Sequence, residues 1–580
     1  MVNLKINNIP VSVPEGTTIL EAARTIGIRI PTLCYLKEIN AIGACRVCVV
    51  EVKGARSMVT ACVYPVSEGM EVITNSEKVK KARKTTLELL LSTHKQDCLS
   101  CSRNLKCELQ ELSKEYGCDS HAFDGEKVAY DKDVSTPYLV RDDEKCILCR
   151  RCVATCAKVQ ETGVIGVNNR GFNSHVACAF DTDLTESPCV ACGQCINVCP
   201  TGALHEVEEI DNVKNALADP EKVVIVAAAP AVRAALGEEF GMPIGTNVEG
   251  QMITALRALG FDKVFDVNFG ADMTIMEEAT ELIQRMTSGG TLPMITSCSP
   301  GWVRYLEYYY PECIPNLSTC KSPQQMTGAL VKTYYADKAG IDPKNIYMVS
   351  VMPCVAKKTE KLRPHTDAAG VPDIDAVLTT RELAKMIKES GLIFPELKGG
   401  EYDNPMGEFT GAGVIFGVTG GVMEAALRSA VYMLTGKNPE DPNFNSVRGM
   451  DGIKEATFDV AGKTVRVAVA SGLTNAKKIC EDIKNGVSKY DFIEIMCCPG
   501  GCINGGGQPI IPEYIKRDVD YKTLRANALY SEDEKRTIRY SHENPAVKDC
   551  YDNYLGSVGA EKAHHILHTQ YFKRKKYPNS

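Results

Sequence analysis

The chain has 580 residues, of which 66 are basic and 73 acidic, giving a formal net charge of −7. This length predicts about four domains, and the absence of a basic stripe argues against a nucleic-acid partner. The longest apolar run, Val223 to Val232, is too short to cross a bilayer, so we expect a buried strand and no membrane span. The 26 cysteines, without a recognisable export signal, favour metal ligation in a reducing cytoplasm.

The first residues have the pattern of a small ferredoxin. Residues 2–14 alternate as a hairpin around Asn7-Asn8, and Thr18-Ile-Leu-Glu21 is a capping box for a helix that ends near Thr25. Four cysteines follow with spacing similar to plant-type ferredoxins, although the first interval is longer than usual: Cys34, Cys45, Cys48 and Cys62. We therefore expect a β-grasp domain with a 2Fe-2S cluster over residues 1–78.

A predicted helix from about Glu77 to His94 leads into a second module over residues 79–125. This module contains four side chains whose spacing would let them reach one 4Fe-4S cluster: His94, Cys98, Cys101 and Cys107. An isolated histidine is more often a polar surface residue. The three neighbouring cysteines favour a ligand role for this one.

The third module, residues 138–208, contains the run C-x2-C-x2-C-x3-C twice. In two-cluster bacterial ferredoxins the fourth cysteine of each run binds the other cluster. One 4Fe-4S cluster is therefore assigned to Cys146, Cys149, Cys152 and Cys199, and its twin to Cys189, Cys192, Cys195 and Cys156. Paired C-x2-C motifs also occur in zinc ribbons, but the duplicated three-cysteine run favours iron–sulfur clusters.

From about residue 223 short apolar strands alternate with amphipathic helices, at 223–226, 263–267, 346–351 and 492–495. This alternation predicts parallel sheets covered on both faces, with ligand sites at the carboxyl ends of the strands. Three cysteine motifs in this part of the chain each follow the end of a strand. They are Thr296-Ser-Cys298-Ser299-Pro-Gly-Trp302, Met352-Pro-Cys354-Val-Ala-Lys357 and Met496-Cys497-Cys498-Pro-Gly-Gly-Cys502.

These three motifs resemble those of the FeFe-hydrogenase catalytic subunits, and the resemblance covers nearly the whole chain. It implies an H-cluster, in which a cysteine sulfur joins a 4Fe-4S cube to a two-iron unit carrying carbon monoxide, cyanide and a bridging dithiolate amine. The resemblance makes Cys354, Cys498 and Cys502 ligands of the cube, with Cys502 as the bridge. Lys357 matches a lysine that hydrogen-bonds a cyanide.

The same resemblance implies a catalytic domain over residues 209–510 and a small-subunit-like region over residues 511–580. Ala231 stands where familiar members carry a serine, a change that we expect to tune the cluster without abolishing its chemistry. The glycines around Cys502 would let the backbone approach a bulky group and adopt positive φ. The residues expected around the cluster are Pro230, Ala231, Gln324, Met352, Pro353, Phe416 and Met496.

The first motif departs from the family pattern, which usually has two adjacent cysteines, one for proton transfer and one for cube ligation. Here Ser299 occupies the ligand position, which a neutral hydroxyl fills poorly. Three arrangements stay open: Cys298 ligates while Ser299 relays protons, Ser299 binds as an alkoxide, or Cys497 compensates. We favour Cys298 as the proton-transfer thiol; a damaged or engineered cluster site is a further reading.

A helix is predicted around residues 272–285, with Glu278, Glu281 and Arg285 along one stripe. Taken alone, this stripe is more typical of an ion-paired helix face. The resemblance instead implies a proton relay through Cys298, Glu278, Ser318, Glu281 and Arg285.

The expected activity is the reversible reduction of protons to H2 by a ferredoxin-type electron carrier, with maturation proteins supplying the diiron unit. One alternative is the catalytic subunit of a multimeric NAD(P)-linked or bifurcating hydrogenase with flavin-containing subunits. A hydrogen sensor and an electron-carrier subunit like the iron–sulfur arm of complex I are others. Residues 411–417 miss the G-x-G-x-x-G nucleotide spacing. His564 and His568 are not expected to bind metal, because no carboxylate or cysteine partner is near in sequence.

Overall fold

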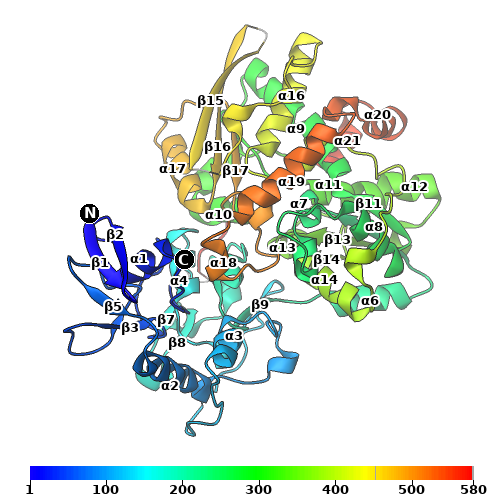
Figure 1. Cartoon of the computed structure of the whole chain (residues 1–580). Coiled ribbons are helices and arrows are strands. Elements are labelled where there is room, and N and C mark those ends of the chain that lie inside the picture. Colours follow the sequence, from blue (N-terminus) through cyan, green and yellow to red (C-terminus); the bar gives the residue numbers. More distant parts are fainter. Residues whose placement is uncertain (128, 451, 461, 578–580) are drawn as a thin grey trace. The chain divides into compact units, whose positions relative to one another are not determined.

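The computed structural model describes residues 1–127, 129–450, 452–460 and 462–577 (Figure 1). Residues 578–580 of the predicted C-terminal region therefore lie outside the described part. The chain divides into two compact units. The first comprises residues 1–187, 194–205 and 511–515, and the second comprises residues 188–193, 206–510 and 516–580. None of the described helices is long and apolar enough to cross a membrane.

The first unit begins with a five-stranded sheet in the order β2-β1-β5-β3-β4. Its strands are β1 (Val2–Ile6), β2 (Ile9–Val13), β3 (Val49–Val52), β4 (Val59–Thr60) and β5 (Glu71–Ile73). The predicted hairpin joins β1 to β2, with positive φ at Asn7 and Asn8. Thr18 caps helix α1 (Ile19–Thr25) as predicted, because its side chain accepts the Glu21 N–H. The Glu21 carboxylate contacts Arg24 and Tyr35 instead of the Thr18 N–H, so only one of the two hydrogen bonds of the capping box is found.

Further α-helices follow in the first unit, and the last two of them contain residues of the cysteine runs. In chain order the helices are α2 (Glu77–Thr93), which matches the predicted 77–94 helix, α3 (Glu108–Glu115), α4 (Arg151–Lys158) and α5 (Gln194–Val198). The buried Arg151 of α4 forms an ion pair with Glu108 of α3 at 2.8 Å. A hairpin of β7 (Ile165–Asn168) and β8 (His175–Cys178) lies between the two cysteine runs in the sequence.

The second unit contains two four-stranded sheets, as the alternating pattern predicted (Figure 1). The first has the order β11-β10-β13-β14 and is entirely parallel: β10 (Val223–Ala228), β11 (Lys263–Asp266), β13 (Ile346–Met352) and β14 (Ala376–Thr379). Successive residues of β14 are all buried, so both faces of this strand are covered. The apolar run at 223–232 is only partly a strand, because Pro230 begins helix α7 (Pro230–Arg233).

The second sheet has the order β12-β17-β16-β15: β12 (Met294–Ile295), β17 (Phe492–Met496), β16 (Lys463–Ser471) and β15 (Ile453–Val460). The first three strands are parallel, and β15 is an antiparallel edge strand. Ile295 is paired with Ile493, so the segments leaving β12 and β17 emerge side by side. Helix α9 (Val267–Ser288) includes the predicted 272–285 helix and begins five residues earlier, capped by Asp266.

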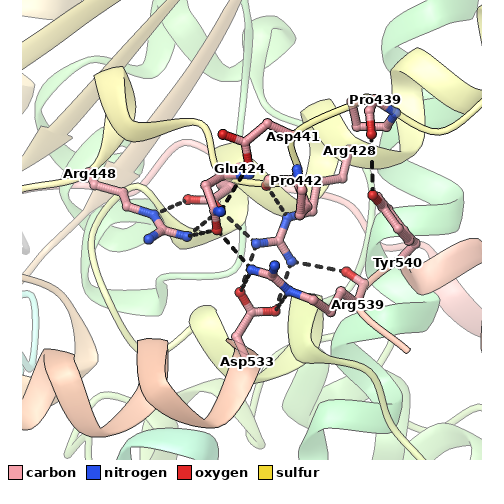
Figure 2. A network of polar contacts seen from close by, with 10 residues as sticks. Glu424, Arg428, Pro439, Asp441, Pro442, Arg448, Asp533, Arg539 and Tyr540 are labelled. Atoms are coloured by element: carbon pink, nitrogen blue, oxygen red, sulfur yellow. Dashed lines mark hydrogen bonds and ion pairs between the residues drawn. The ribbon is translucent and has the colours of Figure 1, made fainter. Parts of the chain in front are cut away.

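The part of the C-terminal region that belongs to the second unit is held there by a buried ion-pair network (Figure 2). Arg428 of α16 (Gly421–Thr435) contacts Glu424 at 2.6 Å and Asp533 of α19 (Tyr521–Lys535) at 2.8 Å. Arg448 also pairs with Glu424 at 2.7 Å, and Arg539 with Asp533 at 2.6 Å. Because Arg428, Glu424 and Asp533 are fully buried, removing one member leaves an uncompensated charge, which typically costs about 3–5 kcal/mol.

Candidate active site

A cavity lies in the second unit, at the carboxyl ends of strands from both sheets. Its walls come from segments that follow β10, β12, β13 and β17. Every residue predicted to surround the cluster lines it: Pro230, Ala231, Gln324, Met352, Pro353, Phe416 and Met496. Lys357, Ser299 and six cysteine side chains complete the chemically active lining: Cys192, Cys298, Cys354, Cys497, Cys498 and Cys502. The fold therefore brings the three late motifs to one place.

The thiols of Cys354, Cys498 and Cys502 lie close enough to interact electrostatically. Burial raises the pKa of Cys354, and the Cys498 and Cys502 thiols raise it further. Burial, followed by the influence of Cys498, raises the pKa of Cys502 to about 12. Several buried thiols facing one apolar cavity are costly as free thiolates, but they match the soft ligand set of an iron–sulfur cluster. The cavity and its donors thus fit an H-cluster.

The glycine-rich segment after Cys498 has two structural roles. Gly500 and Gly501 adopt φ of +89° and +95°, which side-chain-bearing residues rarely do. Gly505 and Gly506 instead permit backbone-to-backbone packing, because an added Cβ would lie 2.1 Å from the Pro353 oxygen and 2.4 Å from the Cys192 oxygen. The glycines therefore allow the Cys502 loop to close against the Cys354 loop, a role that we had not predicted.

Lys357 is held at the cavity wall by three contacts. Its ammonium donates to Ser322 Oγ at 2.8 Å and to the Cys298 carbonyl at 3.2 Å, and it pairs with Glu360 at 2.8 Å. Gln324 donates to the same Glu360 carboxylate at 3.1 Å. Both predicted polar residues of the cavity are thus fixed by one buried carboxylate.

The predicted proton-relay residues from Glu278 to Arg285 form a connected series. Glu278 has the largest charge effect on the Cys298 thiol, and it hydrogen-bonds with Ser318. Ser318 Oγ donates to Glu281 at 3.0 Å, and Glu281 pairs with Arg285 at 2.6 Å. Burial is the main reason that the pKa of Glu278 rises to about 8, and the Glu281 charge raises it further. Oε2 of Glu278 is buried and has no hydrogen-bond partner among the described residues.

Sequence reasoning missed the side chains packed around Glu281. Cys320, His568 and Glu281 offer ligand-type atoms that all lie within 4.8 Å of one another. Thr319 Oγ1 is 2.8 Å from His568 Nδ1, and His568 Nε2 is 3.2 Å from Glu277. The expectation that His568 lacks carboxylate and cysteine partners is therefore wrong, because the fold brings residues about 250–290 positions away to it.

In the first unit, the four thiols predicted to bind a 2Fe-2S cluster meet. Cys48 Sγ lies 3.3 Å from Cys62 Sγ, and Cys34 hydrogen-bonds with Cys45 and Cys62. The hydrogen bond from Cys45, followed by that from Cys62, lowers the pKa of Cys34 to about 2. All four cysteines are buried.

Asn40, which sequence reasoning missed, links this thiol group to the next one. Its side-chain amide donates to the Cys34 carbonyl at 2.7 Å and to the Cys149 carbonyl at 3.0 Å. A single buried amide therefore connects the backbone of two predicted cluster sites.

His94 is 8% exposed, and its Nδ1 has no hydrogen-bond partner among the described residues. Burial, followed by the Lys145 charge, lowers its pKa to about 4, so the imidazole is neutral near pH 7. A neutral imidazole with a free nitrogen suits metal ligation. The Cys101 thiol influences that of Cys107 electrostatically, and Cys98 begins a short 3-10 turn in which its carbonyl accepts the Cys101 N–H.

The first crossed cluster set is also brought together, because Cys146, Cys149 and Cys199 all raise the pKa of Cys152, although burial is the larger cause. The second set is divided between the two units. Cys156 and Cys195 belong to the first unit, and Cys189 and Cys192 belong to the second. This second set stays a prediction from its spacing.

Comparisons with known proteins agree with this arrangement. Residues 222–506 match the family described as the C-terminal domain of the iron-only hydrogenase large subunit, and residues 519–574 match the iron hydrogenase small subunit. Residues 1–77 match a 2Fe-2S cluster binding domain. Residues 83–121 match the iron–sulfur binding region of NADH-ubiquinone oxidoreductase G, and residues 136–205 match the ferredoxin-like domain of NADH-quinone oxidoreductase subunit 3.

The chain belongs to the FeFe-hydrogenase family. It is 49% identical to the NADP-reducing hydrogenase subunit HndD of Solidesulfovibrio fructosivorans, over 99% of this chain and 100% of that protein. It is 46% identical to iron hydrogenase 1 of Clostridium pasteurianum, again over 99% of this chain and all of that protein. An apo FeFe-hydrogenase structure from Chlamydomonas reinhardtii covers 64% of this chain and 100% of its own, with 44% identity and a TM-score of 0.56.

Within this family, the chain is a catalytic subunit with N-terminal iron–sulfur modules and a parallel-sheet catalytic domain. It is an iron hydrogenase, an oxidoreductase that uses iron–sulfur clusters and an H-cluster.

Proposed function

We propose that this hydrogenase interconverts protons and H2 at an H-cluster bound in this cavity, with Cys354, Cys498 and Cys502 as cube ligands. The observation that carries this proposal is the convergence of these thiols with Lys357 and all seven predicted surrounding residues. When bound, the H-cluster supplies the iron centre at which protons and electrons combine.

The protein's own residues hold the site and move protons. The apolar lining keeps bulk water away and strengthens polar contacts at the wall. Lys357, fixed by Glu360 and Ser322, would present a positive charge to a cyanide ligand of the bound group. Cys298 exchanges a proton with Glu278, which passes it through Ser318 to Glu281 and Arg285. Proton transfer between positioned groups requires hydrogen-bond reach, and the Glu278–Ser318–Glu281–Arg285 contacts meet this condition.

We further propose that electrons travel through one 2Fe-2S and three 4Fe-4S accessory clusters, one of them ligated by His94. The corresponding division is 1–78, 79–125, 138–208, 209–510 and 511–580, which the similar family matches support. The H+/H2 couple lies near −0.41 V at pH 7, at about 59 mV per pH unit. Plant-type ferredoxin centres lie near −400 mV, so electrons can pass in either direction with little driving force.

The electron partner is proposed to be a ferredoxin-type carrier. The similarity to an NADP-reducing hydrogenase subunit over its full length favours a second candidate, a role within an NAD(P)-linked complex. Affinity purification of the tagged chain from its native host separates the two. Stoichiometric flavin-containing subunits support the complex, whereas isolation of the chain alone, with ferredoxin-dependent H2 production, supports the ferredoxin-linked enzyme. A cytoplasmic location and a need for maturation proteins are part of the proposal.

The main proposal is tested by infrared spectroscopy of protein produced with the maturation proteins, together with H2 evolution from reduced viologen. We expect bands of bound carbon monoxide and cyanide and steady H2 production. Clusters without those bands, in successfully matured samples, would leave only the electron-carrier interpretation. A Cys502→Ala variant should lose the bands, whereas Cys550→Ala, a buried cysteine outside the cavity lining, serves as the matched control.

A further inference from the structure

The H-cluster cube has four iron corners, but Cys354, Cys498 and Cys502 account for only three protein ligands. The remaining candidates, Cys298, Ser299 and Cys497, all line the same cavity. The contacts of these three side chains decide which of them can be the fourth ligand.

Cys298 faces the proton path. The charged groups that most influence its thiol are Glu278 and Glu494, ahead of Lys357 and Cys502. Cys298 thus lines the cavity and also lies close enough to Glu278 to interact with it electrostatically, as a proton donor at this position must. Turning it toward the cube would break the relay at its first residue.

Ser299 is engaged by its neighbour. Its Oγ accepts the Cys497 backbone N–H at 3.1 Å. To ligate iron well, the hydroxyl would have to ionise in an apolar cavity, where an alkoxide is costly. Iron–sulfur cubes prefer the softer thiolate.

Cys497 occupies the position beside Ser299. β12 and β17 are paired in parallel at Ile295 and Ile493, and the segments that follow them stay in contact, because Ser299 Oγ accepts the Cys497 N–H at 3.1 Å. Exchanging serine for cysteine between these two positions therefore moves the thiol only to the neighbouring segment. The Cys497 side chain is 4% exposed, hydrogen-bonds with the Cys498 and Cys192 thiols, and packs on Gly301, where an added Cβ would lie 2.7 Å from its sulfur.

We propose that Cys497, not Ser299, provides the fourth cysteine ligand of the H-cluster cube. This inference rests on the proposed function, because it assumes that a cube occupies the cavity. On binding, the Cys497 S–H bond breaks, its proton leaves to solvent, and an Fe–S bond forms without any change in oxidation state. Ser299 keeps its proton and continues to accept the Cys497 N–H.

The test uses the full-length chain produced without maturation proteins, so that only iron–sulfur clusters are present. Iron and acid-labile sulfide are counted per chain, and the reduced clusters are recorded by EPR. Cys497→Ala should lose about four iron atoms per chain and one cubane signal. Ser299→Ala and Cys298→Ala should keep the full iron content. The double variant Ser299→Cys/Cys497→Ala should regain the lost iron, because it returns the thiolate to the neighbouring strand end.

Full iron in Cys497→Ala overturns the proposal, and so does loss of about four iron atoms in Ser299→Ala or Cys298→Ala. The Cys192 contact requires a further check. If the signal lost in Cys497→Ala belongs to an accessory cluster, or if the double variant fails to restore it, Cys497 supports the neighbouring cluster and the proposal is wrong. Failure of the proposed function is seen separately, as wild-type protein that holds its clusters but shows no diatomic ligand bands after maturation.

Discussion

Glu278 offers the sharpest test of the proton path. Its carboxyl is buried, its Oε2 has no hydrogen-bond partner among the described residues, and burial raises its pKa to about 8. At pH 7 such a group is protonated about ten times more often than not, yet it still ionises readily enough to pass a proton on. A pKa close to the working pH suits a proton-transfer group.

The change Glu278→Gln preserves the shape of the side chain but removes its ability to release and regain a proton. Loss of a positioned proton-transfer group typically slows turnover about 10²–10⁴-fold, equivalent to about 3–5 kcal/mol in the activation barrier. We therefore expect H2 evolution from reduced viologen to fall by this factor, while the carbon monoxide and cyanide bands keep their positions.

Glu277→Gln is the matched control. Glu277 is the preceding residue on α9 and equally buried, but it bonds with Tyr551 and His568 instead of Ser318. We expect this variant to keep at least a tenth of wild-type turnover, equivalent to a change of about 1.4 kcal/mol. Wild-type turnover in Glu278→Gln, or equal losses in both variants, would refute the relay assignment.

The remaining predictions concern stability and the accessory sites. The pKa of Glu278 is higher in the folded chain (about 8) than in the unfolded chain (about 4.3), so the stability that it contributes falls as pH rises through this window. Between pH 6 and pH 9 the melting temperature of Glu278→Gln should therefore fall less than that of the wild type. The same pH dependence in both proteins would contradict the pKa shift. Asp533→Ala should destabilise the second unit by about 3–5 kcal/mol in denaturant unfolding, because the fully buried Arg428 loses one of its two carboxylate partners and the partly exposed Arg539 loses its ion pair with Asp533. A loss below about 1 kcal/mol would place these charges in water. Asn40→Ala should lower the stability of the first unit by about 1–3 kcal/mol, because it removes two buried hydrogen bonds. An effect near zero would show that the carbonyls of Cys34 and Cys149 find other donors. His94→Ala should remove one 4Fe-4S EPR signal. The control His121→Ala, which changes an exposed histidine of the same module, should keep that signal. An unchanged spectrum in His94→Ala would exclude ligation by His94.

Local patterns in the sequence predicted the strand ends that position the cavity thiols. Each late motif directly follows a short apolar strand, and parallel sheets place such ends at one edge. The stripe of Glu278 and Glu281 was equally visible, because helical spacing is a local property. The resemblance, and not the spacing, supplied the role of this stripe.

Contacts between distant segments were not predictable in the same way. His568 meets Glu281 and Cys320 only because the C-terminal region folds back onto α9, and no periodic signal links these positions. Asn40 likewise has an ordinary loop sequence around it, yet its amide joins two cysteine groups. The glycines after Cys502 predicted that the backbone there approaches another group closely. Only the fold shows that the nearest atoms belong to the backbone of Pro353 and Cys192.

The C-terminal region supports the cavity wall from behind, by packing against the segment that contains the short helix at residues 411–415. Gly417, at the cavity wall, packs so tightly on Leu529 of α19 that an added Cβ would lie 2.5 Å from it. Gly411, which begins α15 (Gly411–Ile415), is equally close to Asp533, where an added Cβ would lie 2.0 Å from the carboxylate. The buried pair of Arg428 and Asp533 therefore fixes α19 behind the segment that presents Phe416 to the cavity. A change at Asp533 should consequently weaken cluster retention as well as stability, although its side chain does not line the cavity.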